Sequence, residues 1–146
     1  MSEIQQLYQQ LILEHNRNPK NFKEIEHADC KLEGYNPLCG DQITIFLKLE
    51  NDVISDIGFQ GKGCAISKAS ASIMTTMLKG KTKAEAAEIF NKFHKMVTDG
   101  TIGENVGKLE VLAGVHKFPS RVKCAILAWH TTMKALDEIK AEDGKR

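Results

Sequence analysis

Apolar residues follow a helical spacing at the start of the chain, alternate with polar residues in the middle, and then return to helical spacing. Residues 3–16 predict an amphipathic helix with the apolar face Ile4, Leu7, Leu11 and Ile12. Asn18-Pro19 ends this helix, because the residue before a proline avoids helical backbone geometry. Residues 42–50 and 53–61 alternate, which predicts two strands joined by a tight turn. Residues 28–34 indicate a weaker strand before them.

The second half of the chain is predicted to be helical. Residues 64–80 carry apolar side chains at helical spacing. Another helix is predicted to begin at Thr82, where Glu85, three positions on, completes a capping box. A short helix is predicted near 108–113. Pro119 opens the last helix, whose apolar stripe is Val122, Ile126, Trp129, Met133 and Leu136.

These elements fit a single domain covering residues 1–146, with a tail at 141–146 that we expect to fray. A chain of 146 residues can bury a core without disulfides. A small antiparallel sheet of about three strands, packed by several amphipathic helices, is an α+β fold. We therefore predict the α+β class.

Composition narrows the class of protein further. Hydrophobic residues make up 42% of the chain and charged residues 27%, which is typical of a globular protein in water. The formal net charge of +1 gives no reason to expect nucleic acid as a partner. No apolar run approaches the about 20 residues that span a bilayer, and the N-terminus lacks the features of a secretion signal. We expect a cytoplasmic protein with no membrane or nucleic-acid partner.

Cysteines carry the candidate chemistry, because a reducing compartment disfavours structural disulfides. Cys39 lies two positions before Asp41, and side chains two apart on an extended chain point to the same side. Gly40 between them permits an unusual backbone conformation. Cys64 and Cys124 lie at or near predicted helix starts, where the partial positive charge of a helix N-terminus lowers the pKa of a thiol.

Three thiolates and one carboxylate form a four-ligand set suited to tetrahedral zinc. Iron–sulfur clusters also use cysteine thiolates, so the residue types alone leave both metals open. Arg121 and Lys123 flank Cys124 and would offset part of the excess negative charge. Cys30 has no comparable context, and we interpret it as structural or simply exposed.

Four stretches of the sequence together resemble the U-type iron–sulfur cluster assembly scaffold family (IscU and NifU N-terminal-like). They are EHNRNPKNF (14–22), GYNPLCGDQITIFLKLE (34–50), GFQGKGCAISKASASIM (58–74) and KFPSRVKCAILAW (117–129). Within the family, the chain is most similar to the SufU branch of Gram-positive bacteria. It has an extra helical segment at about 80–100, and Lys123 stands before the last cysteine, where IscU scaffolds carry a histidine.

The resemblance implies specific roles for the residues at the matching positions. It implies that Cys39, Asp41, Cys64 and Cys124 bind one zinc ion, and that Cys39 accepts sulfur from a pyridoxal-phosphate-dependent cysteine desulfurase of the SufS type. Arg121 matches a family arginine near the site, so we count it with Cys39 as a candidate catalytic residue. The sulfur would pass to downstream iron–sulfur assembly proteins.

Three functions remain open at this level. The first is a zinc-dependent sulfurtransferase that accepts and relays persulfide sulfur. The second is a scaffold on which an iron–sulfur cluster is built and handed on, with iron or a cluster bound transiently. The third is an interaction module with purely structural zinc. The replacement of the family histidine by Lys123 and the extra helical segment favour the first.

Overall fold

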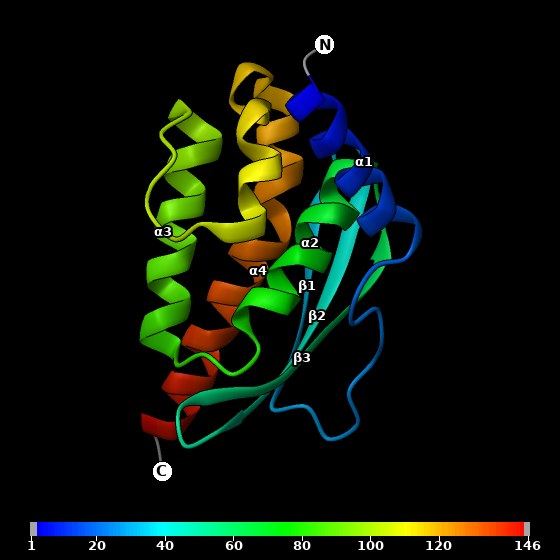
Figure 1. Ribbon diagram of the computed structural model, residues 1–146. Coiled ribbons are helices and arrows are strands. Elements are labelled where there is room, and N and C mark those ends of the chain that lie inside the picture. The colour runs from blue at the N-terminus through cyan, green and yellow to red at the C-terminus, as the bar shows by residue number, and fades with distance from the viewer. Residues whose placement is uncertain (1–2, 145–146) are drawn as a thin grey trace.

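The protein folds as a small antiparallel sheet packed by helices, as the computed structural model shows (Figure 1). The structure describes residues 3–144, and the side chains of residues 5–139. In chain order the elements are α1 (Glu3–Arg17), β1 (Cys30–Asn36), β2 (Asp41–Glu50), β3 (Val53–Lys62), α2 (Ala65–Leu78), α3 (Lys83–Asp99), the 3₁₀ helix η1 (Gly107–Lys117) and α4 (Pro119–Gly144). The predicted α+β class is confirmed.

The sheet has the order β1-β2-β3, and both neighbouring pairs are antiparallel. The alternation that predicted β2 is confirmed, because its inward side chains are fully buried: Ile43, Ile45 and Leu47. The register pairs Asn36 with Asp41 across β1 and β2. It pairs Gln42 with Lys62 across β2 and β3. The turn after β1 and the end of β3 therefore lie at one end of the sheet.

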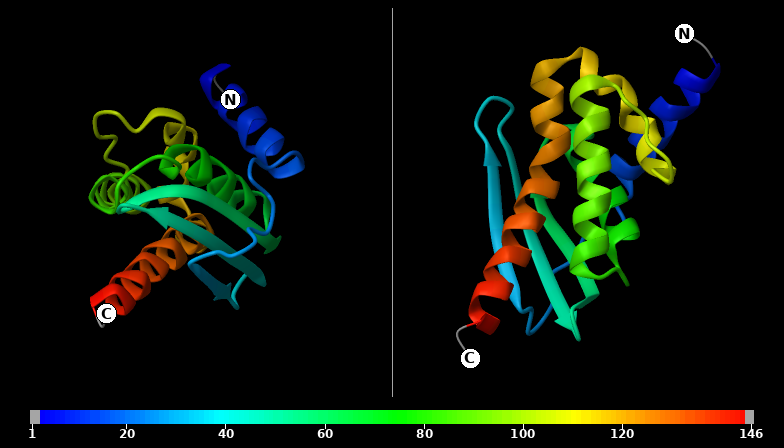
Figure 2. Two further views of the ribbon diagram at one scale, coloured as in Figure 1. Left: turned by 90° about the horizontal axis from the view of Figure 1, so that it is seen from below. Right: turned by 90° about the vertical axis from the view of Figure 1, so that its left-hand side faces the viewer.

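Helices α2 and α4 pack against each other and against the sheet, α4 along β1 and β2 and α2 along β3. Helix α3 packs on α4 and η1, and its start is bonded to the turn between β2 and β3, where the Lys83 N–H donates to the Asp52 carbonyl at 3.2 Å (Figure 2). Trp129 of α4 stacks on Phe93 of α3 with ring centroids 4.7 Å apart, and both side chains are fully buried. The extra helical segment thus adds its own layer to the core.

The predicted apolar face of α1 is wrong for Leu7 and Leu11, and the side chain of Ile4 lies outside the described residues. Leu7 is 52% exposed and Leu11 is 39% exposed, whereas Tyr8 and Ile12 pack against the core. The physical reason is a polar contact on the inner side of the helix. His15 Nδ1 lies 2.7 Å from the hydroxyl of Ser72 on α2, which turns α1 away from the predicted leucine face.

The two other helical predictions near the C-terminus differ in their boundaries. The short helix predicted at 108–113 is the longer 3₁₀ helix η1. Helix α4 continues to Gly144, and the last two residues lie outside the described part, so fraying of 141–146 stays a prediction. Among the residues that the structure describes, no helix is long and apolar enough to cross a bilayer.

Candidate metal centre

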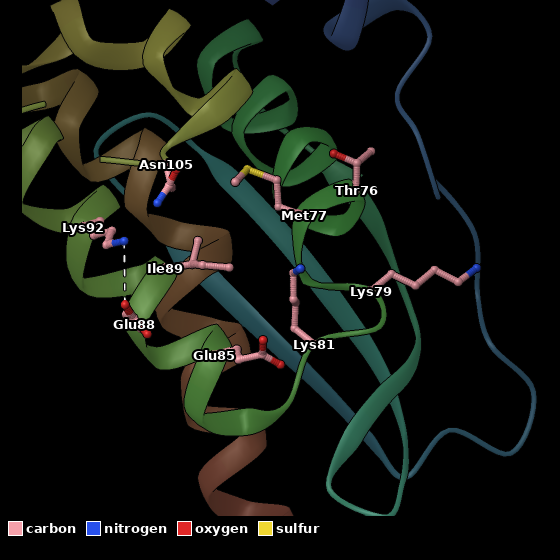
Figure 3. Close-up of a pocket in the computed structure, with 9 residues that line it drawn as sticks. All are labelled: Thr76, Met77, Lys79, Lys81, Glu85, Glu88, Ile89, Lys92 and Asn105. Carbon is pink, nitrogen blue, oxygen red and sulfur yellow. Dashed lines mark ion pairs between the residues drawn. The ribbon is translucent and has the colours of Figure 1, made fainter. Parts of the chain in front are cut away.

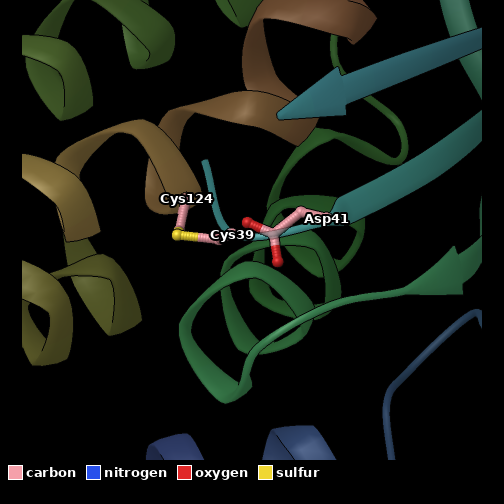
Figure 4. A group of neighbouring side chains, drawn as sticks. All are labelled: Cys39, Asp41 and Cys124. Atoms are coloured by element: carbon pink, nitrogen blue, oxygen red, sulfur yellow. The ribbon is translucent and has the colours of Figure 1, made fainter. Parts of the chain in front are cut away.

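Three of the four predicted metal ligands meet at the end of the sheet where β1 turns into β2. The two thiol sulfurs of Cys39 and Cys124 and a carboxylate oxygen of Asp41 all lie within 4.8 Å of one another (Figure 4). The sulfurs of Cys39 and Cys124 are 3.1 Å apart. These residues come from the turn before β2, the start of β2 and the second turn of α4. The fold therefore unites positions 85 residues apart in the chain.

Asp41 is the buried anchor of this group. Its side chain is fully buried, and its Oδ1 accepts a hydrogen bond of 2.9 Å from the backbone N–H of Cys64. A Cβ on Gly63 would lie 2.6 Å from the same oxygen, a separation at which something must shift. Glycine at position 63 thus allows the end of β3 to pass against the carboxylate.

Cys39 is exposed, unlike its neighbours in the group. It lies in the turn of residues 37–40, between β1 and β2. The predicted approach of its thiol to Asp41 is confirmed, but the extended backbone given as the reason is wrong. Gly40 has a φ of +69°, a left-handed conformation that glycine adopts without steric cost. This bend brings the exposed thiol back toward the buried carboxylate.

Cys64 lies beside the group rather than within it. It is the N-cap residue of α2, and its sulfur accepts a hydrogen bond of 3.4 Å from the backbone N–H of Ser67. The predicted helix start at this cysteine is confirmed. The Cys64 thiol is close enough to that of Cys124 to contribute to the pKa of the latter. As a fourth ligand, Cys64 stays a prediction.

Cys124 behaves differently from the prediction for a thiol near a helix start. Burial raises its pKa well above the ordinary value, and contacts with the Asp41 carboxylate and with the thiols of Cys39 and Cys64 raise it further. The predicted lowering of the pKa is wrong, because Cys124 is only 1% exposed and faces an acid. A divalent cation at this position would deprotonate the thiol.

Sequence reasoning missed Asn36, the last residue of β1. Its side chain is buried, and its Nδ2 lies 3.4 Å from Asp41 Oδ2 and 3.7 Å from Cys124 Sγ. Its Oδ1 accepts a hydrogen bond of 3.3 Å from the backbone N–H of Leu38. An Asn-Pro pair is typical of a turn. The residue types therefore did not indicate that this amide is buried.

Arg121, predicted to act near the site, lies on the first turn of α4. It is exposed, and its guanidinium lies 5.9 Å from the centroid of the Phe118 ring. It lines a surface groove of about 650 Å³ between α1, the start of α2, η1 and the start of α4. Its catalytic role stays a prediction.

A second hollow, of about 430 Å³, lies between α2 and α3, away from the cysteines (Figure 3). Its charged side chains are partly paired: Lys92 with Glu88 at 3.7 Å, and Lys79 with Asp56 at 3.6 Å. Cys30 also lies apart from the group, with its thiol 3.8 Å from a carboxylate oxygen of Glu138. Neither feature adds a ligand to the centre.

The donor set fits a soft divalent cation. Sulfur and carboxylate oxygen are zinc ligands, and three or four of them in tetrahedral arrangement make up a protein zinc site. The residues that could hold the ion are Cys39, Asp41 and Cys124, with Cys64 adjacent. The same thiols could hold iron, so the donor chemistry alone leaves the metal open.

The chain was compared with known proteins. Residues 7–143 match the family described as NifU-like N terminal domain. The chain is 38% identical to the zinc-dependent sulfurtransferase SufU of Bacillus subtilis, covering 98% of this chain and 96% of that protein. It is 37% identical to the iron–sulfur cluster assembly scaffold protein IscU of Streptococcus pyogenes, covering 93% and 86%.

A solved structure agrees with these relatives. A candidate iron–sulfur cluster assembly scaffold protein for the SUF system of Fervidobacterium islandicum superimposes with a TM-score of 0.82 at 36% identity, over 93% of this chain and 96% of that one. The resemblance seen in the cysteine motifs is thereby confirmed. The chain belongs to the NifU-like N-terminal domain family, which includes the U-type iron–sulfur cluster assembly proteins.

Proposed function

We propose that this protein is a zinc-dependent sulfur acceptor of iron–sulfur cluster assembly, which takes persulfide sulfur from a cysteine desulfurase and relays it. One observation carries the proposal: an exposed thiol, Cys39, lies 3.1 Å from the buried thiol of Cys124, beside the buried Asp41. A centre built only for structure would have no need of an exposed ligand. The name of the Bacillus subtilis relative supports the same reading.

The proposed reaction is a transfer of sulfane sulfur between two cysteines. The Cys39 thiolate attacks the terminal sulfur of the desulfurase persulfide, a new S–S bond forms on Cys39, and the S–S bond of the desulfurase breaks to leave its cysteine thiolate. Electrons balance without an outside oxidant. Zinc supplies the means of holding Cys39 deprotonated near neutral pH.

The position of Cys39 supports the proposal that it is the more mobile of the candidate ligands. It lies on a turn whose backbone bends at Gly40, whereas Asp41 and Cys124 are buried in a strand and a helix. A metal-bound thiolate is a weaker nucleophile than a free one, so a Cys39 thiolate that held zinc would react more readily once it was free of the ion. Asp41, Cys64 and Cys124 would then keep the ion in place.

Exposed apolar residues around the reactive thiol suit a protein partner. Leu38, beside Cys39, is 67% exposed, and Tyr35 and Phe118 are also exposed. We propose that these residues meet a pyridoxal-phosphate-dependent desulfurase of the SufS type in the cytoplasm. Downstream iron–sulfur assembly proteins would receive the sulfur.

A second candidate function is that of a cluster scaffold. The relative in Streptococcus pyogenes carries that name, and the thiols of this centre are ligands that iron accepts. A visible absorbance band from a bound cluster, passed intact to an apo-acceptor, would favour the scaffold over the sulfur relay.

Persulfide mapping tests the proposal directly. The purified protein is mixed with a SufS-type desulfurase and free cysteine, and the added sulfur is located by mass spectrometry. We expect it on Cys39 in the natural protein and nowhere in Cys39→Ala, while Cys30→Ala, which removes a thiol outside the centre, is labelled normally. Full labelling or full desulfurase activation with Cys39→Ala would refute the assignment.

A further inference from the structure

One buried amide connects two of the candidate ligands. Asn36 is 6% exposed, and its Nδ2 group points at both Asp41 Oδ2 (3.4 Å) and Cys124 Sγ (3.7 Å). The amide has two N–H donors, so it can serve both acceptors at once. Among the hydrogen bonds of the described residues, none joins the Asn36 side chain to Cys39, the third candidate ligand of the group.

The other end of the same amide contacts only the start of the turn that carries Cys39. Asn36 Oδ1 accepts the backbone N–H of Leu38, two residues before Gly40. The β-sheet register holds Asn36 itself opposite Asp41. The sheet therefore sets the backbone position of Asn36 next to the candidate ligand Asp41.

A donor placed in this way has two physical effects on a metal-bound centre. Hydrogen bonds to a carboxylate and to a thiolate stabilise their charged forms. They also fix the orientation of the ligands, and loss of such partners commonly lowers metal affinity about 10- to 100-fold. Both effects fall on the two buried ligands and spare the exposed one.

We propose that Asn36 is a positioning residue that holds Asp41 and Cys124 as a preformed pair, so that Cys39 can leave the metal without releasing it. This inference rests on the proposed function, because it assigns to that centre a fixed half and a mobile half. The fixed half is the Asn36–Asp41–Cys124 group, and the mobile half is the turn with Cys39.

Metal binding measured without any desulfurase tests this proposal. We expect Asn36→Ala to weaken zinc binding about 10- to 100-fold in a competition titration against a chromophoric chelator. In the cobalt-substituted protein, the thiolate-to-cobalt absorption band should move to lower energy, because a thiolate that loses an N–H donor gives electrons more readily. A merely structural role would leave that band in place.

Two more variants separate the amide from its surroundings. Asn36→Leu keeps nearly the same shape but lacks the N–H donors and adds neither a charge nor a metal ligand. It should show the same band shift even if Asn36→Ala folds poorly. Asn21→Ala is the matched control, since Asn21 bonds Thr75 at 3.0 Å elsewhere in the fold. It should lose stability and keep zinc affinity.

Zinc affinity measured in the Cys39→Ala variant gives the most decisive test. In Cys39→Ala, zinc rests on the fixed half, so adding Asn36→Ala should lower affinity at least as much as it does in the natural protein. If the effect disappears in that background, or if both Asn36 variants bind zinc and absorb like the natural protein, the proposal is overturned. Failure of the natural protein to bind zinc at all would instead overturn the proposed function.

Discussion

Helices α2 and α3 begin with the same backbone geometry but with different chemistry. Their N-cap residues, Cys64 and Thr82, have φ and ψ of −70° and 168° and of −74° and 164°. Each side chain accepts the amide N–H three residues on, that of Ser67 at 3.4 Å and that of Glu85 at 3.1 Å. Only α3 has the reciprocal bond, from the Thr82 N–H to Glu85 at 3.0 Å.

The two caps differ in strength. Serine, threonine, asparagine and aspartate are the preferred N-caps, and sulfur is a weak acceptor. Helix α3 uses the preferred residue and lies away from the metal centre. Helix α2 begins with a poorer cap, and the N–H of that cap is bonded to Asp41 instead. We infer that Cys64 is present for the metal and Thr82 for the helix.

The largest expected effect is that of Cys64→Ser, which exchanges the two kinds of cap. Zinc affinity should fall about 100-fold or more, beyond the effect typical of residues that only support a ligand. In the presence of a chelator, however, the free energy of unfolding should be equal to or higher than that of the natural protein, because serine is the better cap. Urea unfolding with zinc and with EDTA measures both quantities.

A different result would contradict the inference that Cys64 is present for the metal. If Cys64→Ser destabilises the protein equally with zinc and with EDTA, the sulfur acts as a cap or a core atom and does not bind the metal.

The second effect concerns the residue before each cap, Gly63 before Cys64 and Lys81 before Thr82. Gly63→Ala puts a methyl group against the Asp41 carboxylate, which must move away from its bond with the Cys64 N–H. We expect zinc affinity to fall about 10-fold and stability to fall by about 1–3 kcal/mol. Isothermal titration and urea unfolding check the two values.

Gly114→Ala is the matched control for this steric argument. A Cβ at position 114 meets nothing within 4 Å, so zinc affinity should not change. Equal effects of the two substitutions would show that loss of glycine, and not pressure on Asp41, is responsible.

A smaller effect is expected at the other helix. Thr82→Ala removes the side-chain cap of α3 and should cost about 1 kcal/mol of unfolding free energy. Zinc affinity and persulfide labelling of Cys39 should stay as in the natural protein, because α3 contributes no ligand. Thr82→Ser should restore the stability. A loss of zinc in Thr82→Ala would mean that the two helix starts are coupled.

The same two helices show how far sequence reasoning reaches. The capping box of Thr82 and Glu85 could be predicted because both partners lie within one turn, where spacing alone fixes their contact. Cys64 could be placed at a helix start because the helical spacing of apolar residues begins after Gly61 and Gly63. Its hydrogen bond to Asp41 through the backbone could not, because that contact depends on how β3 ends beside β2.

Contacts between distant segments account for the other misses. The buried Asn36 at the end of β1 contacts Cys124 of α4, 88 residues away. The inner face of α1 is set by His15 and its contact with Ser72, 57 residues away. The convergence of the cysteines was predicted from motifs, not from periodicity. The local spacing of apolar and polar residues determines the helices and strands. Packing between distant segments determines which polar groups meet.

The smallest effect is a pH dependence confined to α3. The pKa of Glu85 is lowered from its ordinary value of 4.5, first by the hydrogen bond from the Thr82 backbone N–H and then by the Thr82 side chain. A carboxyl group whose pKa is lower in the folded state stabilises the fold above its unfolded pKa, and this contribution is lost as pH falls through the folded value.

Glu85→Gln should therefore unfold at a lower urea concentration than the natural protein at pH 7. The difference should shrink as pH falls below 4.5. Measuring in EDTA throughout keeps zinc release out of the comparison. A gap between the two proteins that stayed constant from pH 7 to pH 3 would show that the glutamate acts through packing and not through its charge.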